Sequence, residues 1–124
     1  MVTLTEVCFL LDAEGTVLWH DSSGDPSALP DSRERWSAIW DRRDVLAEVA
    51  HSHPRGPLAF SATDLSTMDA VDAALGRRLA YAVVTPENLL RRRPDGSTLI
   101  DDNEPSWVAE LRAASGLGGQ AWQS

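Results

Sequence analysis

Two histidines one residue apart, followed at a defined distance by Ser-x-x-Asp, constrain this chain more than any other feature. His51 and His53 end a predicted strand, and Ser61 and Asp64 follow after a loop. Side chains at positions i and i+2 of a β-strand point the same way, so both imidazoles can face one metal ion. Asp64 then adds a carboxylate oxygen from the start of the next element. The spacing therefore predicts a strand, a loop and a helix start around one site.

Two imidazoles and one carboxylate leave a fourth tetrahedral position for water, as in catalytic zinc sites. A structural zinc site would use four protein ligands, often several cysteines, and this chain has one cysteine. In a simpler interpretation, His51 and His53 are surface residues before a turn proline, and Asp64 lies at a helix N-terminus, where the helix dipole favours a carboxylate without a metal. The complete pattern favours the metal site.

The pattern resembles the motif of the JAMM (MPN-plus) metalloproteases, and reads H-S-H-P-x(6)-S-x-x-D over residues 51–64. That family also has a glutamate upstream, on its first strand. Here Glu6 begins the string E-V-C-F-L-L, with Phe9 where glycine is common. The resemblance extends from about residue 4 to about residue 90. It implies an α/β (α+β) fold of the cytidine-deaminase-like JAMM/MPN type, with a mixed central β-sheet flanked by helices.

The resemblance also implies a role for each residue of the motif. His51, His53 and Asp64 would hold one Zn²⁺ ion with a bound catalytic water. Glu6 would act as general base toward that water and then as general acid toward the leaving amine. Ser61 would donate a hydrogen bond to the oxyanion of the tetrahedral intermediate. The chemistry implied is amide hydrolysis without a covalent intermediate.

Glu6 is a candidate on physical grounds as well. It lies in a predicted strand among apolar neighbours, where an acidic side chain is costly unless it has a partner. An outward-facing strand residue is the alternative interpretation. Glu14, in a predicted turn, and Glu48, whose position in its strand has the wrong parity relative to His51, are weaker candidates for the same role.

The substrate implied by the resemblance is a ubiquitin-like protein or one of its conjugates. Hydrolysis after its C-terminal glycine would either remove the modifier from a target or mature a precursor, as in a bacterial conjugation or antiphage system. Trimming the tail of a sulfur-carrier protein is an alternative. A non-catalytic MPN scaffold that has lost its metal is another. A second copy of the chain, or a partner protein, could cover the region of the first strand.

Hydrophobic periodicity and turn residues predict the elements around the motif. The predicted inner face of the first helix contains Trp36, Ile39 and Trp40. Strands are predicted over residues 2–11, 16–20, 45–52, 79–85, 88–92 and 97–100, and helices from a cap at residue 31 or 32 to residue 43, over 64–76 and over 105–114. The predicted inner face of the second helix contains Leu65, Met68, Val71 and Leu75.

Length and composition set the remaining expectations. The 124 residues predict one domain over 1–115 and a flexible C-terminal tail over 116–124. A net charge of −8 argues against binding to nucleic acid, which requires clustered basic residues. No apolar run approaches the ~18 residues of a membrane span, and the N-terminus lacks the features of a signal peptide. Together with the lone cysteine, this favours the cytoplasm.

Overall fold

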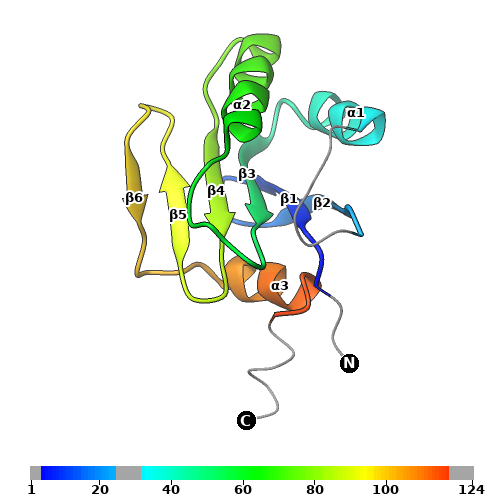
Figure 1. The fold of residues 1–124 in the computed structure, drawn as a ribbon. Helices are drawn as coiled ribbons and strands as arrows, with labels where there is room; N and C mark the ends of the chain where they lie inside the picture. The colour runs from blue at the N-terminus through cyan, green and yellow to red at the C-terminus, as the bar shows by residue number, and fades with distance from the viewer. Residues whose placement is uncertain (1–3, 25–31, 118–124) are drawn as a thin grey trace.

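The computed structural model describes residues 4–24 and 32–117 of the chain (Figure 1). Within these ranges the chain forms one six-stranded sheet, in the order β2-β1-β3-β4-β5-β6, and three helices. In chain order the elements are β1 (Val7–Asp12), β2 (Val17–Ser22), α1 (Arg33–Asp41), β3 (Leu46–Ser52), α2 (Ala62–Leu75), β4 (Ala80–Val84), β5 (Leu89–Arg92), β6 (Thr98–Ile100) and α3 (Ser106–Ala114).

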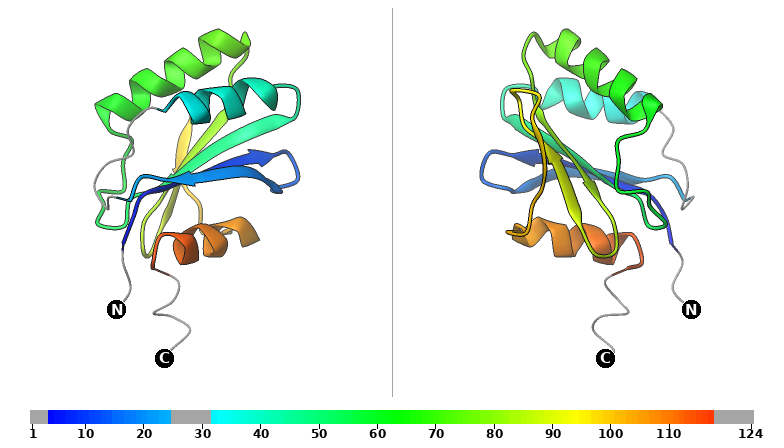
Figure 2. Two further views of the ribbon diagram at one scale, coloured as in Figure 1. Left: turned by 90° about the vertical axis from the view of Figure 1, so that its right-hand side faces the viewer. Right: turned by 60° about the vertical axis from the view of Figure 1, so that its left-hand side comes forward.

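The sheet is mixed, because β3 and β4 run parallel while the other neighbouring strands are antiparallel. A parallel pair requires a crossover connection, and α2 lies within it. Helices α1 and α2 cover one face of the sheet, and α3 covers the other (Figure 2). The chain therefore has the expected mixed α/β class, with a central sheet flanked by helices.

The central strand β1 contributes to a hydrophobic core on each face of the sheet. Its side chains alternate between the faces, as the two-residue period of a strand requires. Val7, Phe9 and Leu11 belong to the core that includes α3, whereas Cys8 and Leu10 belong to the core that includes α1 and α2. All five are buried, so β1 is held in place from both sides.

Each strand and helix predicted from the sequence is present, with its ends moved by a few residues. The largest difference is at the first strand. The prediction starts it at residue 2, outside the described residues, whereas β1 begins at Val7. Glu6 therefore precedes the strand instead of lying within it. The tail predicted to be flexible lies outside the described residues from 118 onward.

The predicted inner face of α1 is partly wrong. Ile39 is buried and Trp36 packs against the core, but Trp40 is 51% exposed. The inward place on the helix belongs to Arg35 instead. Arg35 can be buried because its guanidinium pairs with Asp21, with Nη2 2.9 Å from Oδ2.

The predicted inner face of α2 is wrong at its first residue. Met68 and Val71 are buried and Leu75 packs against the core, but Leu65 is 42% exposed. The position one turn before Met68 on the inner stripe is Asp64, which faces the histidines of β3. A polar residue takes the inward place here because it has polar partners.

Candidate metal centre

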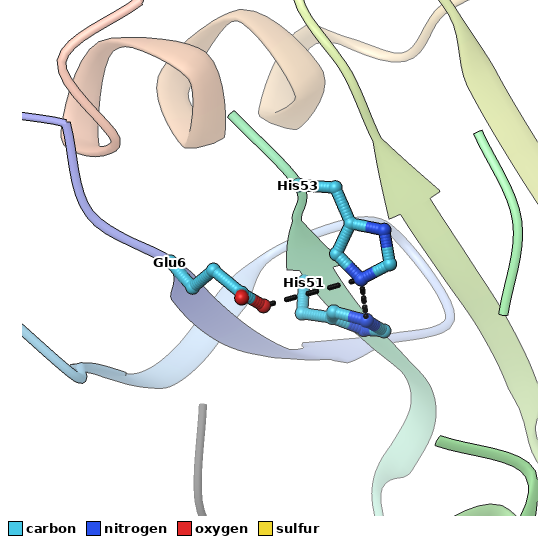
Figure 3. A group of neighbouring side chains, drawn as sticks. All are labelled: Glu6, His51 and His53. Atoms are coloured by element: carbon cyan, nitrogen blue, oxygen red, sulfur yellow. Dashed lines mark hydrogen bonds and ion pairs between the residues drawn. The ribbon is translucent and has the colours of Figure 1, made fainter. Parts of the chain in front are cut away.

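The candidate metal centre lies where the end of β3, the residue before β1 and the first turn of α2 meet. β1 and β3 are antiparallel neighbours, with Cys8 paired to His51. Continuing this register by two residues places Glu6 opposite His53, on the face that also carries His51. Figure 3 shows the Glu6 carboxylate directed toward the two imidazole rings. Strand pairing thus brings together residues that are far apart in the sequence.

The side chains of His51, His53 and Asp64 place three donor atoms in a small triangle. The two Nε2 atoms lie 3.0 Å apart. Asp64 Oδ2 lies 3.2 Å from His51 Nε2 and 3.5 Å from His53 Nε2. A tetrahedral zinc ion with bonds of about 2.0–2.2 Å separates neighbouring ligand atoms by roughly 3.3–3.6 Å. The triangle is therefore close to the size that such an ion requires, and the two nitrogens and one oxygen suit zinc.

Glu6 adds a fourth group to this triangle. Its Oε1 lies 3.9 Å from His53 Nε2, and the residue is buried. One ligand atom each from Glu6, His51 and His53 lie within 4.8 Å of one another, so this group could hold a metal ion. Asp64 is the nearer carboxylate to His53, at 3.5 Å. Both carboxylates therefore lie within reach of the histidine pair, and Asp64 lies closer to it than Glu6 does.

A backbone carbonyl orients the ring of His53. Its Nδ1 lies 2.9 Å from the carbonyl oxygen of Pro57. A carbonyl can only accept, so Nδ1 carries the hydrogen and, in the neutral ring, Nε2 keeps a free lone pair. This lone pair points into the triangle. A hydrogen bond from the second ring nitrogen to a carbonyl is the usual support of a metal-binding histidine.

The first turn of α2 fixes Asp64. The backbone N–H of Ser61 donates to Asp64 Oδ2 at 2.8 Å, and the N–H of Asp64 donates to Ser61 Oγ at 3.0 Å. This reciprocal pair is a capping box, with Ser61 as N-cap. Helix capping and the approach to the histidines involve the same carboxylate oxygen. The capping interpretation and the metal-ligand interpretation of Asp64 are therefore compatible.

Ser61 lies at the exposed edge of the centre. Its Oγ accepts the hydrogen bond from the Asp64 amide, which occupies a lone pair and leaves the hydroxyl hydrogen able to donate. Ser61 is thus placed next to the triangle with a donor that can reach an incoming group. The structure brings all five residues of the predicted site to one place.

The surroundings of the triangle favour positive charge. Burial lowers the pKa of His53, but hydrogen bonds with Asp64 and with the Pro57 carbonyl, and the charges of Asp64 and Glu6, outweigh it, so the pKa is raised. Burial raises the pKa of Asp64, but its hydrogen bonds with His51 and His53 outweigh it, so this pKa lies well below its usual range. A cation placed between these groups is stabilised, whether it is a proton or a metal ion.

Other polar residues near the motif have different surroundings. Burial raises the pKa of the Cys8 thiol to about 12, so it stays protonated and is a poor nucleophile. Ser52 points to the opposite face, where its Oγ accepts from the Val7 amide at 2.9 Å and lies 2.7 Å from Ser115 Oγ. Glu48 shares that face and pairs with Arg91 at 2.7 Å. Glu48 therefore faces away from His51, as its position in the strand predicts.

Sequence reasoning missed the contribution of Pro57. It acts through its backbone carbonyl, so no side-chain pattern could reveal it. The path of the loop between β3 and α2 decides which carbonyl meets His53 Nδ1, and a motif does not encode that path.

The sequence matches no protein-family model, and a search of curated proteins gives no significant match. In the described part of the chain, no helix is both long enough and apolar enough to cross a membrane. The geometry and donor atoms of the site are therefore the guide to its chemistry. Glu6, His51 and His53 form a group that could hold a metal ion, and Asp64 lies directly beside the two histidines.

Proposed function

We propose that this protein is a zinc-dependent peptidase or isopeptidase of the JAMM type. One observation carries the proposal: His51 Nε2, His53 Nε2 and Asp64 Oδ2 converge within 3.0–3.5 Å, with the Glu6 carboxylate at their side. This is the ligand set and neighbouring carboxylate that the motif implies. The mixed sheet with helices on both faces is compatible with the cytidine-deaminase-like fold of that family.

In this proposal His51, His53 and Asp64 hold the zinc ion. When bound, the ion would lower the pKa of a water molecule toward 7 and polarise the scissile carbonyl. The hydrogen bond from His53 Nδ1 to Pro57 keeps the ligand nitrogen of that ring aimed into the site. The capping box does the same for the carboxylate of Asp64.

Glu6 would serve as the general base and general acid. Its Oε1 is 3.9 Å from His53 Nε2, too far for a direct hydrogen bond but near enough to reach a water molecule held beside the triangle. An Oε atom of Glu6 takes a proton from the attacking water and then delivers it to the leaving nitrogen. Burial of Glu6 keeps bulk water away from this transfer.

Ser61 would stabilise the oxyanion. Its hydroxyl lies beside Asp64 at the exposed edge of the centre, so it can donate to a carbonyl oxygen that approaches from solvent. Positioned donors of this kind stabilise charge that develops in the transition state.

The substrate that we propose is the C-terminal tail of a ubiquitin-like protein in the cytoplasm, cut after its last glycine. A flexible glycine tail can lie along exposed strand edges and pass close to the metal centre. The proposal includes both deconjugation and precursor maturation. It is also compatible with a second copy or a partner protein packed beside the first strand.

Metal analysis is the first test. Elemental mass spectrometry of purified protein should find about one zinc per chain, and His51→Ala should lose it. His20→Ala is the matched control, because His20 is exposed on β2 and outside the centre. Zinc retained in His51→Ala would contradict the proposed ligand set. No zinc, even after zinc is added to folded wild-type protein, would contradict the proposal and favour a scaffold. Cleavage is then tested on fusions of ubiquitin-like proteins.

A further inference from the structure

A pocket adjoins the metal centre between the sheet and helices α1 and α2. It has a volume of ≈ 70 Å³, and His51 and Asp64 both line it. Glu6 and His53 do not, so the pocket opens on one side of the donor triangle only. Its apolar lining includes Cys8, Ile39, Val49, Phe60, Met68 and Tyr81.

Buried side chains form the floor of this pocket. Cys8, Ile39, Met68 and Tyr81 are all buried, and they come from β1, α1, α2 and β4. A group that enters from the metal centre must therefore end inside the pocket. A side chain can do so, but a chain that continues into another polypeptide cannot.

Several polar groups also line the pocket, and two of them, the Tyr81 hydroxyl and the Arg35 guanidinium, already have partners. The Tyr81 hydroxyl lies 2.7 Å from Asp72 Oδ1, so its ring is the part that a ligand meets. The Arg35 guanidinium pairs with Asp21 at 2.9 Å. The Cys8 thiol is neutral, since burial raises its pKa to about 12. An acidic side chain would lose its hydration here beside the Asp64 carboxylate, with the Arg35 guanidinium already paired to Asp21, whereas an apolar side chain gains from burial.

We infer that this pocket binds the apolar side chain of the residue that follows the scissile bond. The inference rests on the proposed function: the tail before the bond ends in glycine, which has no side chain, so only the residue after the bond can fill the pocket. Leucine, methionine or phenylalanine would fit this apolar surface. In a lysine isopeptide the leaving nitrogen belongs to the lysine side chain, whose aliphatic chain continues into a second polypeptide. The pocket therefore selects linear precursors over lysine conjugates.

Val49 is the residue to change. It precedes His51 by two positions on β3, so its side chain lies on the same face of the sheet, and it lines the pocket. Val49→Phe would fill the pocket without altering a proposed metal ligand. Val45→Phe is the matched control, because Val45 is 56% exposed just before the same strand and lies outside the pocket. Thr67→Phe, on the α2 wall, is an independent second variant.

The test measures binding of the leaving product, so it does not require the natural substrate. The probes are the dipeptide amides Leu-Gly-NH2, Gly-Gly-NH2 and Asp-Gly-NH2, titrated into metal-free and zinc-loaded protein. Methyl NMR reports the binding site directly, because Met68 lines the pocket and the chain has only 2 methionines. Leu-Gly-NH2 should bind at least about tenfold more tightly than either other dipeptide and shift the Met68 signal. Val49→Phe and Thr67→Phe should abolish this preference, and Val45→Phe should keep it.

Equal binding of the three dipeptides, or a Leu preference that survives both pocket variants, would overturn the inference. So would a lack of binding accompanied by a higher melting temperature of Val49→Phe, which would identify the space as a packing defect. The result is separable from the proposed function. A Leu preference in metal-free protein supports the pocket even if no fusion is cleaved, and cleavage that ignores the residue after the bond rejects the pocket while the peptidase stands.

Discussion

Each face of the sheet carries a cluster of ionisable side chains that are largely buried. The two clusters differ in where their positive charge comes from. On the face of α3, the Arg91 guanidinium lies between two carboxylates, 2.7 Å from Glu48 and 3.2 Å from Asp101. On the face of α1 and α2, the nitrogens of His51 and His53 face each other at 3.0 Å. The first cluster contains its own permanent cation. The second is built from groups that could hold a cation from solution.

The pKa values of the two clusters follow this difference. Burial lowers the pKa of Arg91, but hydrogen bonds and charge from Glu48 and Asp101 outweigh it and raise the pKa. Arginine stays charged in any case, so that cluster does not respond to its surroundings. A histidine such as His53 can give up its proton and offer a lone pair to a metal ion. A buried carboxylate near histidines is therefore a stronger indicator of function than one near arginine.

The largest effect is expected from breaking the metal centre. Glu6→Gln should reduce cleavage by about 1000-fold or more while zinc is retained, because the proton acceptor is lost and the ligands remain. His53→Ala should lose both zinc and cleavage. Zinc per chain and cleavage rate, measured on the same preparations, separate the two roles. Full activity in Glu6→Gln would remove Glu6 from the mechanism.

Ser61→Ala should come next. It removes the proposed oxyanion donor and should slow cleavage by about 100-fold. It also removes the N-cap of α2, which should lower the free energy of unfolding by about 1 kcal/mol. Ser32→Ala is the control, because Ser32 caps α1 through the Arg35 amide at 3.0 Å and is not one of the proposed site residues. It should cost a similar amount of stability with little loss of activity. Equal activity losses in both variants would assign Ser61 a structural role only.

Breaking the other cluster should change stability without changing metal content. Arg91→Met leaves Glu48 and Asp101 without their cation, and should lower the free energy of unfolding by about 2–3 kcal/mol. Urea denaturation measures this change. The exposed neighbour variant Arg93→Met should lie within about 0.5 kcal/mol of wild type. Loss of zinc from folded Arg91→Met would show that the two clusters are coupled.

The smallest effect is expected for Cys8→Ala. Cys8 is buried beside the pocket, and removal of its sulfur should lower the free energy of unfolding by about 1 kcal/mol. Zinc content and cleavage should persist, because a thiol with a pKa of about 12 is neither a nucleophile nor a ligand at neutral pH. A large loss of zinc in this variant would place a thiolate in the metal centre.

The sequence predicts the elements of the fold, and which side chains share a strand face, where local rules decide. The parity of β3 separates His51 and His53 from Ser52 and Glu48, because the two-residue period of a strand has no exceptions over so short a length. Ser61 is the N-cap of α2, and its capping box joins it to Asp64, only three positions further along the chain. These features depend on neighbours in the chain, which a sequence displays directly.

Predictions from sequence fail where a partner far away in the chain determines which side chain faces inward. Trp40 and Leu65 are exposed because Arg35 and Asp64 take the inward places, and each does so for a partner far away in the sequence. Hydrophobicity alone ranks the apolar residue as the inner one. The role of the Pro57 carbonyl cannot be predicted from the sequence for a similar reason, since it depends on the path of a loop.

The pairing of Cys8 with His51 has a consequence for how the chain reaches its functional state. A slip of β1 by one residue along β3 would turn Glu6 to the opposite face, away from both histidines. Only chains with the native pairing would then carry the complete set of groups. A metal ion that binds only the natively paired chain would stabilise that chain by mass action. The population of molecules with a slipped β1 would fall as a result.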